Sequence, residues 1–543
     1  MACRLEIDGK ETAAVPGSSI FDAAETIGVH VPTSCVKQGK CRECMVEIEA
    51  GAECLTPRSP EEEHLPPSFR LSCRARFAEE GLVSCHTMRR GTLRIEEEAT
   101  GLDSPAVADR DPRYRRRGTQ LLRGAEIIGE TIGPIHGLAI DVGTTTVVLR
   151  LENLESGRPV ATQSFENPQR FGGSDVMARI RYDTDHRGRL LQRVLFGYLR
   201  RAIESLPCDP QLIVDVMVVG NTTMRDLFFG LDVYSIGQLP YRSITEHERR
   251  DGRRTTTSLE VPASKLRLPL HAQATVTSLP LVADHVGSDA AACLLATGLA
   301  KRDSVSMCMD IGTNTELFIG NRERILAASC PAGPAFEGGG VLCGVPALDG
   351  AIERVVIGDD GTVATRVIGD RPPIGICGSG LVDLLGELLR TGRINQVGRY
   401  TDDESRFLVD RDHDIVLTEG DIDELAQAKG ANAAGLHIVA DRYGIELSQV
   451  EHFYVAGGFG RHLDVAAARR IGLVPDLPEA RIHQVGNAAL AGAVHALHSM
   501  VARRKLDEIV GRIEHVELET HPGFFDYFID GCQFAAMAGS EVK

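Results

Sequence analysis

Three cysteines lie within ten positions of the chain, and thiols gathered this closely can hold a metal centre. Five residues separate Cys35 from Cys41, and two residues separate Cys41 from Cys44. Four thiolates bind either one tetrahedral zinc ion or the two irons of a 2Fe–2S cluster. The Cys-x-x-Cys spacing is common to both kinds of site, but a second well-spaced Cys-x-x-Cys pair, which would favour zinc, is absent. The pattern therefore favours the cluster, with a zinc site as the alternative.

The fourth thiol has three candidates, which are Cys54, Cys73 and Cys85. Cys73 stands in the segment Arg-Leu-Ser-Cys, and 28 residues separate it from Cys44. This arrangement resembles the plant and adrenodoxin types of 2Fe–2S ferredoxin, whose last ligand lies in a similar Arg-Leu-small-Cys segment. The resemblance implies that the cluster ligands are Cys35, Cys41, Cys44 and Cys73. Cys85, and after it Cys54, remain the alternative fourth ligands.

The residues around these cysteines predict a β-grasp domain. Two strand-like runs meet at an Asp8-Gly9 turn, which is a hairpin signal. A helix is expected next, capped by Ser18 or Ser19. Gly39 allows the cysteine loop to curl so that its amides point at the sulfur atoms. Strands are expected at 3–9, 11–17, 44–51, 69–77 and 92–98, with the helix at 18–29.

A second kind of motif occurs twice, in residues 137–168 and again in 306–334. Each copy has an apolar strand, an Asp-x-Gly-Thr turn and two further strands, which indicates an internal duplication. Backbone amides and small hydroxyls in such a turn suit phosphate oxygens, and the leading aspartate suits Mg²⁺. We therefore take Asp141 and Asp310 as candidate catalytic residues. The candidate phosphate-binding residues are Gly143, Thr144, Thr145, Gly312, Thr313 and Asn314.

A third glycine-rich element follows the buried-strand run at 450–463. Its glycines, Gly457, Gly458 and Gly460, allow a flat adenine or ribose to approach the backbone. The ordered set of three motifs resembles the acetate and sugar kinase, heat-shock chaperone and actin superfamily, known as ASKHA. That resemblance implies two ribonuclease-H-like lobes with ATP in the cleft between them. The P-loop pattern GxxxxGK[ST] is absent, which disfavours a Walker-type nucleotidase.

Other segments leave alternatives open. Glu337 could reach the nucleotide or a water molecule, or it could be a solvated loop carboxylate. Ser379 could help to present a helix N-terminus to phosphate, or it could simply cap that helix. The small-residue run at 485–500 predicts a packing helix with structural histidines. Four further thiols near the proposed cleft form no ligand spacing and are expected to be packed: Cys308, Cys330, Cys343 and Cys377.

Composition narrows the class of protein. The 543 residues are too many for one core, and a net charge of -17 argues against a nucleic-acid binder. The basic run at 110–123 is interpreted as solvated linker, with a docking site as the alternative. No stretch of eighteen apolar residues predicts a membrane span, and the first fifteen residues lack the apolar core of a secretion signal. We therefore expect a cytoplasmic protein whose 14 cysteines stay reduced.

The whole arrangement resembles the reductive activators of corrinoid proteins, in which a ferredoxin domain precedes a connector and an ASKHA domain. The expected fold class is multidomain α+β and α/β. We place a 2Fe–2S ferredoxin-type domain at 1–98, a connector at 99–135 and an ASKHA ATPase domain at 136–543, with lobes at 136–300 and 301–543. The connector is short for the family, which leaves open whether it forms a domain.

The resemblance implies an ATP-dependent transfer of one electron from the 2Fe–2S cluster to cobalt(II) of a corrinoid protein, giving cobalt(I). The implied cofactors are the cluster, ATP and Mg²⁺, and the implied partners are a corrinoid protein of a methyltransferase system and an unidentified low-potential electron donor. Nucleic acid and membrane are not expected as partners, and a homodimer is one candidate for the oligomeric state. The rival classes are an activator of another low-potential metalloenzyme and a redox-sensing ASKHA kinase or binding module.

Overall fold

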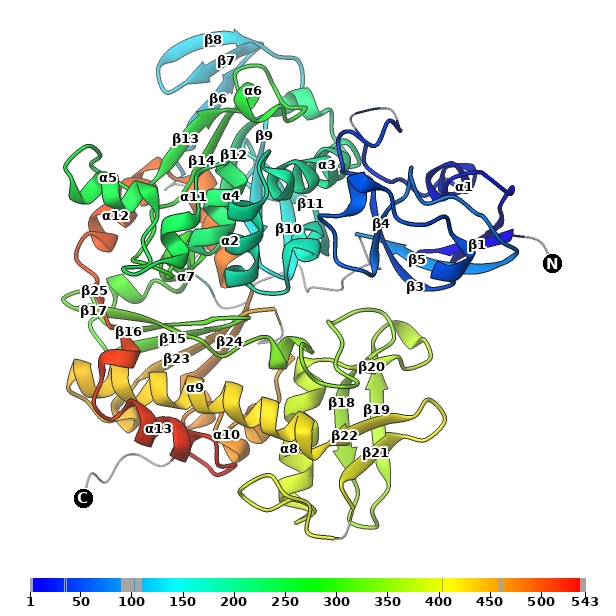
Figure 1. The fold of residues 1–543 in the computed structure, drawn as a ribbon. Coiled ribbons are helices and arrows are strands. Elements are labelled where there is room, and N and C mark those ends of the chain that lie inside the picture. Colours follow the sequence, from blue (N-terminus) through cyan, green and yellow to red (C-terminus); the bar gives the residue numbers. More distant parts are fainter. Residues whose placement is uncertain are drawn as a thin grey trace.

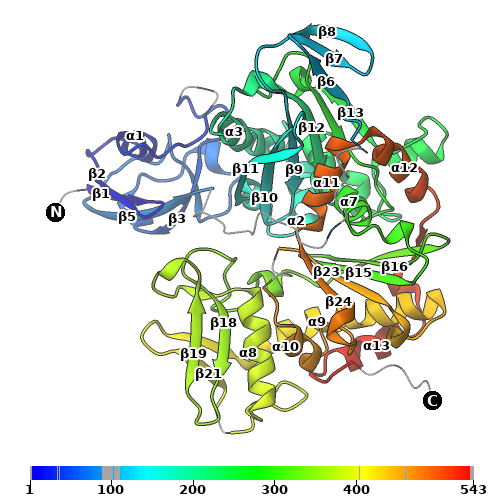
Figure 2. The same ribbon diagram turned by 180° about the vertical axis from the view of Figure 1, so that it is seen from behind.

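The computed structural model describes residues 3–33, 35, 37–88, 102, 110–402, 404–458 and 462–537. They form an N-terminal module, a small sheet and two large lobes, and the module rests against the first lobe (Figure 1). Seen from behind, the second lobe lies below both of them (Figure 2). Within the described residues, no helix is both long enough and apolar enough to cross a membrane.

The N-terminal module is a β-grasp domain, as predicted. Its sheet has the order β2-β1-β5-β3-β4, in which β1 and β5 run parallel and the other neighbours run antiparallel. Ser19 rather than Ser18 caps the helix, because its hydroxyl accepts from the Asp22 amide in a capping box. The elements are β1 (Cys3–Ile7), β2 (Lys10–Ala13), α1 (Ile20–Thr26), β3 (Met45–Ala50), β4 (Phe69–Leu71) and β5 (Gly81–Thr87).

The sequence-based prediction missed β5, which lies between β1 and β3 in the sheet. Its side chains alternate, with Val83, Cys85 and Thr87 buried, as expected for a strand with one face on the core. The segment 92–98, which was predicted as the closing strand, lies outside the described residues.

The basic run at 110–123 is not a solvated linker, and that interpretation was wrong. It supplies two strands of a small antiparallel sheet formed by β6 (Tyr114–Arg117), β7 (Gln120–Arg123) and β8 (Glu126–Glu130). Arg116 forms an ion pair with Glu155 at 2.8 Å, and the buried Tyr114 hydroxyl lies 2.6 Å from the Thr275 hydroxyl. Part of the positive charge of this run is therefore used in an ion pair with the first lobe.

The first lobe is a six-stranded sheet in the order β11-β10-β9-β12-β14-β13. Its first three strands are antiparallel, and β12 and β14 then run parallel to β9. The strands are β9 (His136–Val142), β10 (Thr146–Asn153), β11 (Arg158–Glu166), β12 (Ile213–Val219), β13 (Leu259–Pro262) and β14 (Thr275–Ser278). The helices are α2 (Val176–Asp185), α3 (Leu190–Glu204), α4 (Thr222–Phe229), α5 (Ile244–Arg250) and α6 (Ala263–Leu266).

The second lobe repeats this plan, which confirms the predicted duplication. Its main sheet has the order β24-β23-β15-β16-β17-β25, with β15–β17 antiparallel and β23 and β24 parallel to β15. The strands are β15 (Ser306–Ile311), β16 (Thr315–Gly320), β17 (Ile325–Cys330), β23 (His452–Ala456), β24 (Ile482–Gly486) and β25 (Glu514–His515). The helices that accompany this sheet are α9 (Glu419–Tyr443), α10 (Val465–Ile471) and α13 (Phe524–Gly531).

A smaller subdomain extends from the second lobe, below the N-terminal module in Figure 1. It contains α8 (Gly378–Arg390) with two small sheets. Their strands are β18 (Ala351–Ile357), β19 (Val363–Val367), β20 (Gly375–Ile376), β21 (Arg406–Asp410) and β22 (Ile415–Thr418).

Two helices between the lobes join the sheets through one shared core. They are α7 (Ser288–Thr297) and α11 (Ala488–His498), and α12 (Met500–Val510) follows α11. Gly492 permits the close packing of α11 on α7, since a Cβ there would meet the Ala292 carbonyl at 2.0 Å. The predicted packing role of residues 485–500 is therefore confirmed, and His495 and His498 are buried in it.

Candidate functional site

The four predicted cluster thiols form two close pairs. Cys35, Cys41 and Cys44 lie in the loop before β3, and Cys73 follows β4. The Sγ atoms of Cys44 and Cys73 lie 3.3 Å apart, and the Cys41 thiol hydrogen-bonds to Cys35. All except Cys35 are buried. The structure thus brings together the residues that the ferredoxin resemblance implied.

Backbone amides of the loop point at two of these sulfurs. Burial acts to raise the pKa of Cys35, but the amides of Cys41, Gln38 and Lys40 outweigh it and hold that pKa below its usual range. The Cys44 thiol and the Gly39 amide lower the pKa of Cys73 to about 7. Gly39 has a φ of 74°, so the curl expected of this loop uses the left-handed region that glycine favours. The loop therefore favours thiolate at Cys35 and Cys73, whereas the Cys73 hydrogen bond and burial raise the pKa of Cys44.

The two-pair arrangement bears on the choice between zinc and an iron–sulfur cluster. In a tetrahedral zinc site all four sulfurs lie about 3.8 Å from one another, because each Zn–S bond is about 2.3 Å. In the described part of the chain, the one group of three His, Cys, Asp or Glu ligand atoms within 4.8 Å of one another does not involve these thiols. Two separate pairs fit two metal ions better than one.

The rival fourth ligands lie elsewhere in the module. Cys85 is buried in β5 opposite Ile48 and Ile7, and burial raises its pKa. The Cys54 thiol donates to the Glu80 carbonyl at 3.7 Å, away from the other pairs. Both therefore behave as packed thiols.

The predicted nucleotide residues line one cavity of about 150 Å³ between the lobes. The Asp141 turn joins β9 to β10, the Asp310 turn joins β15 to β16, and Gly457 and Gly458 follow β23. Gly460 lies outside the described residues. The predicted residues in the lining are Asp141, Gly143, Thr144, Thr145, Asp310, Gly312, Thr313, Asn314, Gly457 and Gly458.

The cavity is strongly acidic. Five carboxylates line it: Asp141, Asp289, Asp310, Glu316 and Glu337. Burial raises the pKa of each one, to about 7 for Asp141 and to about 8 for Asp289. Neighbouring carboxylates add to the effect at Asp289, where Asp141 and Asp310 repel the charged form. A bound cation would reverse this repulsion, so the lining is suited to Mg²⁺.

Sequence reasoning missed Asp289 and Glu316. Asp289 lies in the first turn of α7, and Glu316 lies inside β16, far along the chain from the first motif. An isolated acidic residue at a helix start is common, so no local signal distinguished Asp289.

Asparagines that were also missed fix the first phosphate turn. Asn221 caps α4 with its oxygen and donates its amide to the Thr144 hydroxyl at 3.0 Å. Asn487 caps α11 in the same way and donates to Asp141 at 2.7 Å. Only a side chain with both an acceptor and a donor can cap a helix and hold the turn at once. The sequence signal for each residue is an asparagine directly before a helix. Helix capping alone accounts for such an asparagine, so the signal does not indicate a role in the site.

The structure places Glu337 inside the cavity, in the short helical turn Ala335–Glu337. One carboxylate oxygen accepts from the Thr145 hydroxyl at 3.2 Å and from the Thr313 hydroxyl at 2.5 Å. Glu337 therefore connects the two phosphate turns. Ser379 does not cap α8, because its buried hydroxyl donates to the Glu353 carbonyl at 3.0 Å. That the N-terminus of this helix meets a phosphate stays a prediction.

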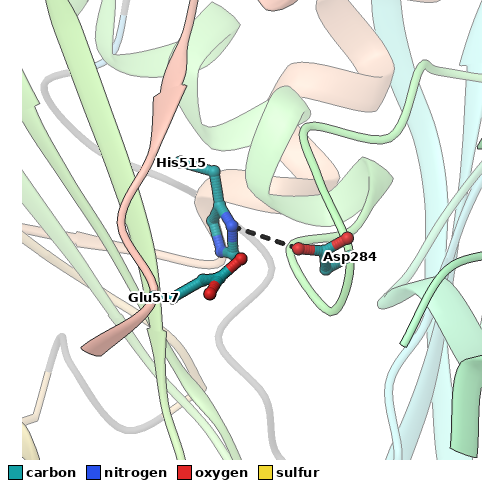
Figure 3. Close-up of side chains that lie close together, drawn as sticks. All are labelled: Asp284, His515 and Glu517. Carbon is teal, nitrogen blue, oxygen red and sulfur yellow. Dashed lines mark ion pairs between the residues drawn. The ribbon is translucent and has the colours of Figure 1, made fainter. Parts of the chain in front are cut away.

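A second contact crosses between the lobes. The Asp284 carboxylate of the first lobe lies 3.2 Å from Nδ1 of His515 on β25, with Glu517 beside them (Figure 3). The three side chains have the spacing of a metal site. However, the Arg242 guanidinium also lies 3.3 Å from Asp284, so a cation already neutralises that carboxylate. We therefore interpret the contact as an ion pair that joins the lobes.

Three family descriptions match consecutive parts of the chain. Residues 5–78 match the 2Fe-2S iron-sulfur cluster binding domain. Residues 136–302 match the RACo middle region, and residues 304–542 match the C-terminal domain of RACo, the ASKHA domain.

Similar proteins match along most of their length. Corrinoid activation enzyme RamQ of Eubacterium limosum is 27% identical, over 95% of this chain and 96% of the relative. The [Co(II) methylated amine-specific corrinoid protein] reductase of Methanosarcina barkeri is 25% identical, over 73% of this chain and 76% of the relative. A solved structure of a reductive activator for corrinoid,iron-sulfur protein covers 98% of each chain at 27% identity with a TM-score of 0.70.

Proposed function

The chain belongs to the RACo family of reductive activators of corrinoid proteins, and on this premise we propose that it uses ATP to pass one electron to cobalt(II) of a corrinoid protein, giving cobalt(I). The observation that carries the proposal is the union in one chain of a paired-thiol loop and an acidic cleft with two facing phosphate turns. The corrinoid substrate is inferred from the two relatives, a corrinoid activation enzyme and a corrinoid protein reductase.

Four thiols would hold the cluster, with Cys35 and Cys41 at one iron and Cys44 and Cys73 at the other. The donor set fits, since the loop amides already stabilise thiolate at Cys35 and Cys73. When bound, a 2Fe–2S cluster would supply one electron, at a potential near −400 mV in plant-type ferredoxins. The reaction also requires a low-potential electron donor and a reducing compartment, for which we propose the cytoplasm.

The cleft residues would bind Mg²⁺ and ATP from both lobes. The hydroxyls and amides of the two turns would hold the phosphates, and Gly457 and Gly458 would leave room for the adenosine. Asp141 and Asp310 would hold Mg²⁺ directly or through its waters. Glu337 accepts hydrogen bonds from the Thr145 and Thr313 hydroxyls, and a phosphate that takes over these hydroxyls would free its carboxylate to orient a water molecule.

Nucleotide would act by shifting the balance between two arrangements of the lobes. A ligand changes such a balance only by the difference between its affinities for the two states. Here residues of both lobes line the cavity, and Glu337 connects the two phosphate turns through Thr145 and Thr313. A nucleotide that takes over these hydroxyls would break the connection and so favour a different lobe separation. We propose that this change controls the docking or release of the corrinoid protein.

A hydrolysis assay with three kinds of candidate partner tests this function. The intact chain with Mg²⁺ and ATP is assayed alone, with a cobalt(II) corrinoid protein, with a 2-hydroxyacyl-CoA dehydratase and with small metabolites. We expect the corrinoid protein to raise the rate of phosphate release and the others to leave it unchanged. Stimulation by a metabolite, with none by the corrinoid protein, would instead assign a kinase.

A further inference from the structure

The cysteine loop is only partly exposed to solvent, because helix α3 of the first lobe covers part of it. The module and the first lobe share one hydrophobic core. A Cβ on Gly197 of α3 would meet the Pro32 ring at 3.0 Å, and the Tyr198 hydroxyl accepts from the Met88 amide at 3.0 Å. Figure 1 shows α3 beside the module, on the side away from α12.

One arginine of α3 reaches the ligand loop itself. Nη2 of Arg193 donates to the carbonyl of Cys41 at 3.0 Å. Its Nε atom is buried and has no hydrogen-bond partner in the described part of the chain. Arg193 is half-buried, and a buried N–H group is unfavourable unless an acceptor or a negative charge lies nearby. The contact with the Cys41 carbonyl puts the guanidinium beside the ligand loop, where the cluster that Cys35, Cys41, Cys44 and Cys73 would hold carries negative charge.

A fixed positive charge at this place alters the chemistry of the cluster. Two Fe³⁺, two sulfides and four thiolates sum to a charge of about −2, and one-electron reduction makes it about −3. The cation stabilises the more negative, reduced form, so it raises the reduction potential. Arg193 belongs to the lobe and not to the module, so its effect depends on docking.

We propose that Arg193 raises the reduction potential of the cluster because the module rests on α3, so that the intact chain holds a weaker reductant than the separated module would. The inference rests on the proposed function. The cluster accepts one electron from the low-potential donor and gives it up as cobalt(II) becomes cobalt(I). Arg193 is thus a tuning residue, by which the contact between the module and the first lobe sets the driving force of both steps.

The test measures the midpoint potential of the cluster in the full chain by mediated redox titration, followed by visible absorption and electron paramagnetic resonance. Arg193→Gln removes the charge and Arg193→Lys keeps it. Arg200→Gln removes a charge from the same helix, at a side chain that donates to the Arg267 carbonyl. We expect Arg193→Gln to shift the oxidised-to-reduced ratio at fixed potential about tenfold toward oxidised, equivalent to about 59 mV for one electron. Arg193→Lys and Arg200→Gln should stay close to the unmodified chain.

A second pair of variants tests the dependence on docking. Gly197→Phe places a ring where Pro32 packs, and small-angle X-ray scattering reports whether the module has separated. In this separated background, Arg193→Gln should no longer change the potential. The proposal is overturned if Arg193→Gln leaves the potential unchanged, if the lysine variant shifts as far as the glutamine variant, or if the shift persists after separation. If the unmodified chain binds no cluster at all, it is the proposed function that fails.

Discussion

Replacing Asp289 by asparagine should stabilise the ligand-free protein, although it removes a residue from the centre of the cleft. Asparagine has the same shape, and its oxygen can still accept from the Ala290 amide, which bonds to Asp289 at 2.7 Å. What is lost is a buried negative charge that Asp141 and Asp310 repel. The change therefore isolates the electrostatic cost of an acidic cleft without its cation.

The size and sign follow from the raised pKa of Asp289, about 8 in the folded chain against 3.8 for the free group. The folded chain holds this proton more tightly than the unfolded chain does. The contribution of Asp289 to the free energy of unfolding is therefore fully present below about pH 4 and is lost as the pH rises through 8. Roughly four pKa units at about 1.4 kcal/mol each give an upper bound near 5 kcal/mol for the free energy of unfolding that the Asp289 charge removes at pH 8. We expect Asp289→Asn to gain at least about 2 kcal/mol there, and the gain to be about 2 kcal/mol smaller at pH 6.

Urea unfolding in the presence of a chelator, followed by far-ultraviolet circular dichroism at pH 6 and pH 8, measures this gain. Asp209→Asn is the matched control, because Asp209 also accepts from a nearby backbone amide but is exposed. A variant that is less stable than the unmodified chain at pH 8, or a gain that does not change with pH, would refute the electrostatic reasoning. Added Mg²⁺ should shrink the difference, since the cation neutralises the same charges.

Three further predictions concern other parts of the molecule. Cys73→Ala should abolish the visible absorption of the reconstituted cluster while Cys85→Ala keeps it, and an equal loss in both would contradict the ligand assignment. Asp310→Ala should lower Mg²⁺-dependent ATP turnover at least about a hundredfold in a phosphate-release assay, because metal positioning is lost; unchanged turnover would remove Asp310 from the site. His515→Ala should weaken the contact between the lobes by about 1 kcal/mol and so speed nucleotide dissociation about fivefold in stopped-flow measurements. An unchanged dissociation rate would show that this ion pair does not restrain separation of the lobes.

Local signals in the sequence were enough to predict both kinds of domain. The cysteine spacing fixed the ligand loop, and the repeated Asp-x-Gly-Thr turns predicted two related lobes, since both depend on residues close together in the chain. Asp289 and Glu316 could not be predicted in this way, because only the closing of two sheets around α7 and α11 brings them to the first turn. Asn221 and Asn487 also gave no distinguishing signal, because an asparagine before a helix is common as a cap.

Misinterpretations arose where a local pattern had a common explanation. A cluster of arginines usually marks exposed linker, but here Arg113 and Arg116 pair with Glu260 and Glu155 of the first lobe. The strand β5 was missed because its partner strand β1 lies at the far end of the module sequence. The contact of α3 with the cysteine loop has no sequence signal at all, since it depends on how two separate folds pack.

The most direct test of the account is the reduction of cobalt by the intact chain. Reduced protein is mixed anaerobically with a cognate cobalt(II) corrinoid protein, and formation of cobalt(I) is followed by its absorption spectrum with and without Mg²⁺ and ATP. We predict cobalt(I) only with nucleotide, and none from Asp310→Ala although that variant keeps the spectrum of its cluster. Equal cobalt(I) formation without nucleotide would contradict it, because the acidic cleft would then have no part in driving the electron.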